Sequence, residues 1–128
     1  MSFSGKILLV DDEVHIRKFV SLILKQTGQP VIAEAGNGEE ALRAYQSDKP
    51  DIVLLDVNMP RMDGMETLRK LKEIDPDCVV VMLTSLANRE SVERALELGA
   101  AGYIRKDTPK DEIARALSEL IDPSTPTE

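Results

Sequence analysis

Five short apolar runs alternate with five segments whose apolar residues recur at helical spacing. Short continuous apolar runs are typical of parallel strands that are buried on both faces. The predicted strands are residues 7–10, 31–33, 52–55, 79–83 and 101–104. Because strands that alternate with helices favour right-handed crossovers, the pattern predicts an α/β fold: a doubly wound, five-stranded parallel sheet with five helices.

Capping and breaking residues mark where the predicted helices begin and end. Asn37 and Asp63 are predicted N-caps, and Glu66 follows Asp63 at the spacing of a capping box. The fourth helix is predicted to start at about Asn88. Helical spacing predicts one buried face in the first helix, made of Ile16, Phe19, Val20, Ile23 and Thr27. The residues predicted to end helices are Gly28, Pro50, Pro76 and Gly99.

Length and charge narrow the class of protein. The 128 residues suit one domain, which we place at 1–121, followed by a flexible polar tail at 122–128. A net charge of -7 argues against direct binding to nucleic acid, which needs a basic stripe, and against an anionic membrane. No apolar run approaches the ~20 residues of a membrane span, and residues 1–6 do not resemble a signal peptide. Cys78 is the only cysteine, so we expect no disulfide within the chain and a cytoplasmic location.

Polar residues that can carry chemistry stand at the carboxyl ends of four predicted strands. They are Asp11 and Asp12 after the first strand, Asp56 after the third, Thr84 and Ser85 after the fourth, and Lys106 after the fifth. The second strand ends in Glu34-Ala35-Gly36, for which we predict no role. The carboxyl ends of parallel strands share one edge, where open α/β sheets bind their ligands. We therefore expect these groups to lie together.

Three neighbouring carboxylates repel one another unless a cation compensates them. Oxygen ligands with no histidine or thiolate within reach favour Mg²⁺ over zinc. A nucleophilic carboxylate, Mg²⁺, a lysine and a hydroxyl are the groups that stabilise a phosphoryl group during in-line transfer. The residues alone therefore predict that Asp56 is phosphorylated to an acyl phosphate, with help from Lys106 and Thr84.

Each candidate residue also has an ordinary structural interpretation. The acidic pair could simply cap the first helix, and Thr84 could belong to a plain loop at a strand end. Lys106 could be a solvated lysine, and Tyr103 a half-buried strand residue. His15, the only histidine, is expected on the surface.

The order and spacing of the motifs carry a family resemblance. After the acidic pair come Leu-Leu-Asp-Val-Asn-Met-Pro-Arg-Met-Asp-Gly at 54–64, Thr-Ser at 84–85 and Gly-Tyr-Ile-Arg-Lys at 102–106. Over about residues 6–121 this pattern resembles the receiver domain of two-component response regulators, similar to the single-domain chemotaxis type. The resemblance implies the strand order 2-1-3-4-5 of the flavodoxin-like fold.

The resemblance also implies a function and partners. A histidine kinase or phosphotransfer protein would phosphorylate Asp56, and the face made by the fourth helix, fifth strand and fifth helix would then regulate a downstream protein effector. The chain would be a phosphoacceptor signalling domain and not an enzyme, apart from self-catalysed phosphoryl transfer and slow autodephosphorylation. The sequence leaves open which kinase and effector are involved, and whether phosphorylation drives formation of a homodimer.

A Mg²⁺ site follows from the same resemblance. Asp12, Asp56 and the backbone carbonyl of Asn58 would be its protein ligands. Asp11 would complete the acidic pocket through a water molecule.

The remaining implied roles concern the fourth and fifth strands. Lys106 would pair with the phosphoryl oxygens, Thr84 would turn toward them, and Tyr103 would move inward behind it as part of the switch. One residue departs from the family pattern, because Asp107 stands where the family commonly has a proline after the lysine. A cis bond without proline costs roughly 3–4 kcal/mol, so we expect either a trans bond or a strained loop here.

Two other functions compete with a signalling switch. Phosphatases that form an aspartyl phosphate also use a nucleophilic Asp at a strand end, but they need a second Asp two residues later, where this chain has Asn58. The other alternative is a receiver-like binding module that is never phosphorylated. The complete acidic pocket and Lys106 argue against it.

Overall fold

The computed structural model describes residues 5–26, 31–59, 62–85 and 88–121. Five strands and five helices alternate along the chain. They are β1 (Lys6–Val10), α1 (Val14–Lys25), β2 (Val31–Ala35), α2 (Gly38–Asp48), β3 (Ile52–Leu55), α3 (Gly64–Ile74), β4 (Val80–Thr84), α4 (Arg89–Glu97), β5 (Gly102–Arg105) and α5 (Lys110–Ile121). The strands pair in parallel in the order β2-β1-β3-β4-β5, which confirms the expected sheet.

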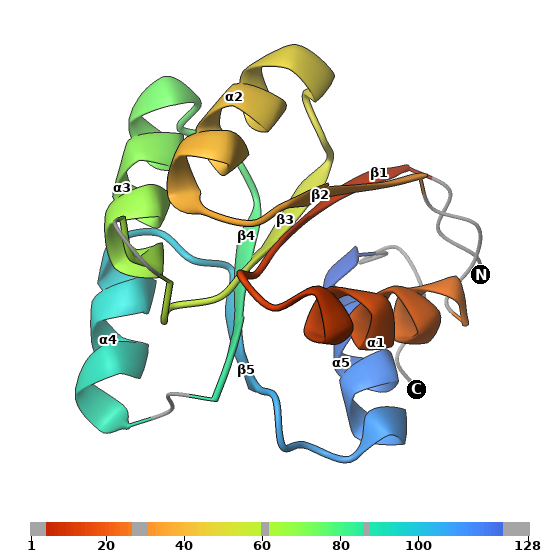
Figure 1. Ribbon diagram of the computed structural model, residues 1–128. Coiled ribbons are helices and arrows are strands. Elements are labelled where there is room, and N and C mark those ends of the chain that lie inside the picture. Colours follow the sequence, from red (N-terminus) through yellow and green to blue (C-terminus); the bar gives the residue numbers. More distant parts are fainter. Residues whose placement is uncertain (1–4, 27–30, 60–61, 86–87, 122–128) are drawn as a thin grey trace.

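Helices cover both faces of the sheet (Figure 1): α1 and α5 lie against one face, and α2, α3 and α4 lie against the other. Alternate residues of each central strand enter opposite layers of the core, as the strand pleat requires. In β3, for example, Val53 and Leu55 face the α2–α4 layer, whereas Ile52 and Leu54 face the α1–α5 layer. No helix among the described residues is long and apolar enough to cross a membrane.

Three strands extend further toward their carboxyl ends than their apolar runs predict. β2 continues to Ala35, β4 to Thr84 and β5 to Arg105. The register explains the difference, because Val10 pairs with Ala35 and Thr84 pairs with Arg105. Backbone pairing does not require an apolar side chain, so the apolar pattern underestimates these strands.

The predicted N-caps Asn37 and Asp63 are confirmed, because each accepts a hydrogen bond from the backbone N–H three residues later. Asn88, where the fourth helix was predicted to start, caps α4 in the same way. Gly99 follows α4 with a φ of 104°, a conformation that favours glycine. The predicted end of α1 at Gly28 lies outside the described residues, and α1 itself ends at Lys25.

The predicted buried face of α1 is only partly correct. Val20 and Ile23 are buried and Ile16 is half-buried, but Phe19 is 42% exposed. Thr27 lies outside the described residues. Phe19 precedes Val20 by one residue, which places it about 100° away around the helix. Leu24 is buried in its place. The spacing rule finds the direction of the buried face but not its edges.

Gly64 allows the start of α3 to lie directly against the end of β3. A Cβ at this position would lie 2.1 Å from the Asp56 carbonyl oxygen and 2.6 Å from Val57 Cα. The Gly64 N–H also donates to the Val57 carbonyl at 2.8 Å. The contact supports the backbone that carries Asp56, and it leaves no room for a side chain.

Tyr45 joins α2 to the end of α3 at the other end of the molecule. Its hydroxyl donates to Asp75 Oδ2 at 2.7 Å, and Asp75 is the C-cap of α3. This hydrogen bond, together with one from the Asp77 N–H, holds the pKa of Asp75 below its ordinary value. Burial, followed by the bond to Asp75, raises the pKa of Tyr45.

Gly64→Ala is expected to destabilise the fold by at least about 1–3 kcal/mol, the usual effect of inserting a methyl group into a packed region. Urea unfolding measures the change. Gly36→Ala is the matched control, because a Cβ there would meet Arg17 and Glu40 at an ordinary 3.6 Å. Equal stability losses in the two variants would contradict the close approach at Gly64.

Tyr45→Phe is expected to raise the pKa of Asp75, because the main hydrogen bond to its carboxylate is lost. A carboxyl whose folded pKa is lowered contributes stability above its unfolded pKa of about 3.9 and loses it as the pH falls through the folded value. The variant should therefore be less stable than the parent at neutral pH, and the difference should shrink under acid. An NMR titration of Asp75 and unfolding curves at several pH values test both points. An unchanged Asp75 pKa would contradict the assignment.

Candidate functional site

Backbone hydrogen bonds carry the strand ladder one residue beyond three strands and place polar residues side by side. The N–H of Asp11 donates to Ala35 of β2 at 3.1 Å, and that of Asp56 donates to Val10 of β1 at 3.0 Å. The N–H of Lys106 donates to Thr84 of β4 at 2.9 Å. The carboxyl edge of the sheet therefore fixes where these side chains begin.

The three predicted carboxylates form one cluster. Oxygen atoms of Asp11, Asp12 and Asp56 lie within 4.8 Å of one another. Asp11 and Asp56 are each only 3% exposed, whereas Asp12 is exposed. The cluster therefore has a buried floor and one side open to solvent.

Lys106 supplies the positive charge beside this cluster. Its Nζ lies 2.5 Å from Asp11 Oδ2 and 3.3 Å from Asp56 Oδ2, and its side chain is only 15% exposed. Burial alone would lower the pKa of Lys106. The hydrogen bond to Asp11 and the negative charges of Asp56 and Asp11 outweigh burial, so the pKa is raised and the lysine stays charged.

Burial and four neighbouring residues act on the pKa of the Asp56 carboxyl. Burial raises the pKa of its carboxyl, and the nearby charge of Asp11 adds to this effect. A hydrogen bond with the Thr84 hydroxyl and the charge of Lys106 act in the opposite direction, as does the Asn58 N–H, which donates to Oδ1 at 3.3 Å. Desolvation makes this carboxylate more basic, and the surrounding donors keep it oriented.

The donor set of the cluster fits a hard divalent cation. All three side chains offer carboxylate oxygens, and two of them are buried beside one another at the edge of the sheet. Mg²⁺ prefers oxygen ligands and keeps several waters, which the exposed side at Asp12 allows. Lys106 compensates only part of the negative charge, so the cluster can accept a further cation.

The other predicted residues occupy more ordinary positions. Tyr103 is half-buried, and its hydroxyl is hydrogen-bonded to Ser91 of α4. Burial and then the charge of Asp56 raise the pKa of Tyr103. Asn58 is exposed. His15 has a side chain that is 76% exposed, as expected for a surface residue.

Two alternatives left open by the sequence can now be decided. The N-cap of α1 is Glu13, and no side-chain hydrogen bond caps this helix start, so the acidic pair does not cap α1.

The peptide bond after Lys106 is the second alternative. No cis peptide bond occurs among the described residues, so Lys106 and Asp107 are joined by a trans bond. An exposed ion pair of 2.6 Å joins Arg105 Nη2 to Asp107 Oδ2 in this loop. Lys106 reaches the cluster without the usual proline.

One pair of residues at this edge was not predicted from the sequence. Arg17 of α1 donates through Nη1 to the Asp11 carbonyl oxygen at 2.5 Å and through Nε to Glu34 Oε1 at 2.7 Å. Glu34, at the end of the strand for which no chemical role was predicted, therefore forms an ion pair at this edge. No local motif marks either residue, because the contact joins positions 17 residues apart.

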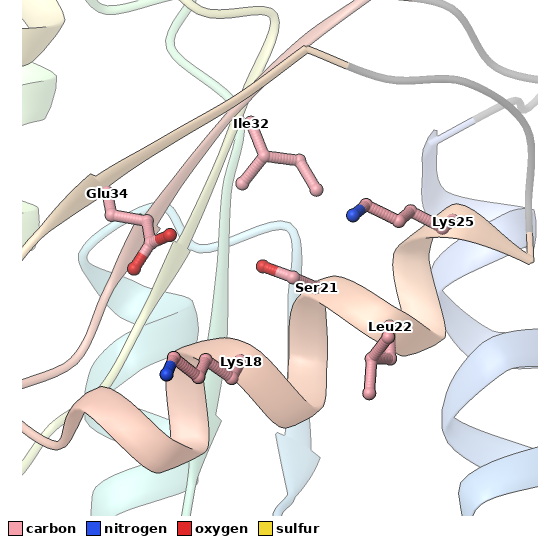
Figure 2. A pocket seen from close by; sticks show the side chains of 6 residues that line it. All are labelled: Lys18, Ser21, Leu22, Lys25, Ile32 and Glu34. Carbon is pink, nitrogen blue, oxygen red and sulfur yellow. The ribbon is translucent and has the colours of Figure 1, made fainter.

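A groove of about 520 Å³ lies between α1 and β2 (Figure 2). Its lining residues are Lys18, Ser21, Leu22, Lys25, Ile32 and Glu34. None of the three clustered carboxylates lines it, so the groove is not where the acidic cluster would do its chemistry.

Comparisons with known proteins agree with this geometry. The chain is 39% identical over 114 residues to the chemotaxis protein CheY of Listeria monocytogenes, covering 89% of this chain and 96% of that protein. It is 34% identical over 116 residues to CheY of Bacillus subtilis, covering 91% and 97%.

Solved structures share the fold. A chain of the CheX–CheY–BeF3–Mg²⁺ complex from Borrelia burgdorferi aligns with a TM-score of 0.82 and 34% identity, covering 88% of this chain and 87% of that one. A CheY-like receiver domain protein from Methanospirillum hungatei aligns with a TM-score of 0.84 and 28% identity, covering 94% and 95%.

The response regulator receiver domain family matches residues 7–118, and this range contains the whole acidic cluster and Lys106. The sheet order, the cluster and the similarity to CheY proteins all agree with that match. The chain therefore belongs to the response regulator receiver domain family and is a phosphorylation-controlled switch of two-component signalling.

Proposed function

We propose that Asp56 is the phosphoacceptor of this switch. The observation that carries the proposal is the position of its carboxylate: 3% exposed, 3.3 Å from Lys106 Nζ and within 4.8 Å of two other carboxylates. Burial raises the pKa of Asp56 and so increases its basicity, while the Asn58 N–H orients one oxygen and leaves the other near Lys106.

In the proposed step, one Asp56 oxygen attacks phosphorus and forms the O–P bond of an acyl phosphate. The bond from phosphorus to the donor breaks, and the leaving group keeps the electron pair. A histidine kinase or a phosphotransfer protein is the expected donor, and its histidine nitrogen would be the leaving atom. Lys106 stabilises the negative charge on the phosphoryl oxygens, because its ammonium is already at the site.

Asp12, Asp56 and the backbone carbonyl of Asn58 would hold Mg²⁺, with Asp11 contributing through water. When bound, Mg²⁺ would neutralise charge on the phosphoryl oxygens and help to orient them. The clustering of the three carboxylates supports this assignment.

The conformational response is proposed to run through Thr84 and Tyr103. The Thr84 hydroxyl already lies within hydrogen-bonding reach of Asp56, so it can turn to a new phosphoryl oxygen. Tyr103 is hydrogen-bonded to Ser91 of α4 and is close enough to Asp56 for that charge to raise its pKa, and its inward movement would change the contact with Ser91. The face made by α4, β5 and α5 would then change its affinity for a downstream protein effector, with a phosphorylation-dependent homodimer as an open alternative.

We further propose that residues 1–121 form the receiver domain, that 122–128 are a flexible tail, and that the protein acts in the cytoplasm. Beyond its own phosphoryl transfer and slow autodephosphorylation, no enzymatic turnover is expected. A phosphatase of the aspartyl-phosphate type would need an acid or base at position 58, where an exposed asparagine stands.

Incubation with Mg²⁺ and a small acyl-phosphate donor is expected to add a single phosphate to the parent chain and none to Asp56→Asn. Intact-mass spectrometry measures the adduct, and omission of Mg²⁺ should abolish it. An adduct that persists in Asp56→Asn would contradict the assignment of the acceptor. Sustained hydrolysis of small phosphate esters by the parent would instead favour the phosphatase alternative.

Lys106→Met is expected to slow phosphorylation on the order of 10²-fold, the usual effect of removing one donor from a charge-stabilising site. Mg²⁺ affinity should stay the same or increase, because a competing cation leaves the cluster. A time course of the phosphate adduct and calorimetric Mg²⁺ titration measure the two effects. Lys110→Met is the control, because Lys110 lies exposed at the start of α5. A parent-like rate in Lys106→Met would refute the role of the lysine.

A further inference from the structure

Arg17 connects three elements at the edge that carries the acidic cluster. It projects from α1, donates to the carbonyl of Asp11 at the end of β1, and pairs with Glu34 of β2. Figure 2 shows Glu34 pointing from β2 toward α1. Only 15% of the Arg17 side chain is exposed. A planar guanidinium can hold two acceptors at once, which a lysine ammonium on a flexible stem does less well.

The Asp11 carbonyl belongs to the peptide bond that leads to Asp12. Arg17 is the partner of that carbonyl, and the other polar atoms of Asp11 also have partners. Its N–H donates to Ala35, its Oδ1 accepts from the Glu13 N–H at 3.0 Å, and its Oδ2 contacts Lys106. Every polar atom of Asp11 therefore has a partner, and together these contacts fix the turn into Asp12. The direction in which Asp12 leaves this turn decides where its exposed carboxylate lies.

If Arg17 strengthens the binding of a cation at the cluster, its own positive charge is not the cause. A positive group near three carboxylates weakens the binding of a divalent cation by repulsion. Here Glu34, at 2.7 Å, compensates part of that charge. Partners that orient metal ligands commonly change metal affinity by 10–100-fold. By orienting the Asp11–Asp12 turn, Arg17 would strengthen cation binding, whereas its charge would weaken it. These opposite effects can be separated by experiment.

We propose that Arg17, held by Glu34, is a positioning residue that fixes the Asp11–Asp12 turn and thereby sets the affinity of the acidic cluster for Mg²⁺. The inference rests on the proposed function, because it takes the three carboxylates as the Mg²⁺ site. The proposal gives Arg17 of α1 and Glu34 of β2 a role at the Mg²⁺ site that no local sequence motif reveals.

The test is calorimetric Mg²⁺ titration of the unphosphorylated chain. Arg17→Met is expected to weaken Mg²⁺ binding about 10-fold or more, although it removes a positive charge. Arg17→Lys keeps the charge but not the planar fork, and it should also weaken binding. The double variant Arg17→Met with Glu34→Gln keeps the net charge of the parent and should match Arg17→Met.

Tyr45→Phe is the matched control for a general loss of stability, because its hydrogen bond to Asp75 lies at the opposite end of α3 from the cluster. It should bind Mg²⁺ as the parent does. Urea unfolding without Mg²⁺ shows that each variant is folded. If Arg17→Met is unfolded, Arg17→Lys decides the question, because it keeps the charge and most of the side-chain stem.

The outcomes separate the inference from the proposed function. Parent-like or tighter Mg²⁺ binding in folded Arg17 variants would overturn the positioning role and leave the Mg²⁺ site intact. Equal weakening in Tyr45→Phe would also overturn it, because general loosening would then explain the effect. A parent chain that binds no Mg²⁺ would overturn the proposed function and the inference together.

Discussion

The structure depends on how buried negative charge is tolerated at one edge of a sheet. Asp11 and Asp56 are almost completely enclosed, and carboxylates in that position are costly unless they are paired and hydrogen-bonded. Lys106 contacts both of them, and backbone N–H groups bind one oxygen of each. The compensation is incomplete, since three carboxylates face one lysine in the cluster. The remaining negative charge is the basis of the proposed Mg²⁺ site and of the proposed phosphoryl transfer to Asp56.

Backbone contacts hold the residues at this edge of the sheet in place, and these contacts leave little room for substitution. The strand ladder continues one residue into the site at Asp11, Asp56 and Lys106, so each reactive side chain starts from a hydrogen-bonded position. Gly64 brings the start of α3 against the Asp56 carbonyl, where a larger residue would displace the backbone. A site built on strand ends is more rigid than one built on loops, which would suit the proposed in-line phosphoryl transfer to Asp56.

The clustered carboxylates, Thr84 and Lys106 were predictable because each stands within two residues of the end of an apolar run. A parallel sheet places the carboxyl ends of its strands at one edge, so the sequence pattern alone predicts that Asp56, Thr84 and Lys106 meet there. Strand ends were less predictable. Polar residues such as Thr84 and Arg105 belong to strands because their backbones pair, and the apolar pattern does not record backbone pairing.

The sequence by itself determined the alternation of strands and helices, the capped helix starts at Asn37 and Asp63, and the position of Asp56 at the end of a central strand, because these depend on neighbours along the chain. The tertiary structure alone decided that Phe19 lies on the exposed side of its helix and that Glu34 holds Arg17. It also decided that Lys106 reaches two carboxylates from a loop joined by a trans peptide bond. These features depend on contacts between distant segments, and such contacts exist only after the sheet has brought those segments together.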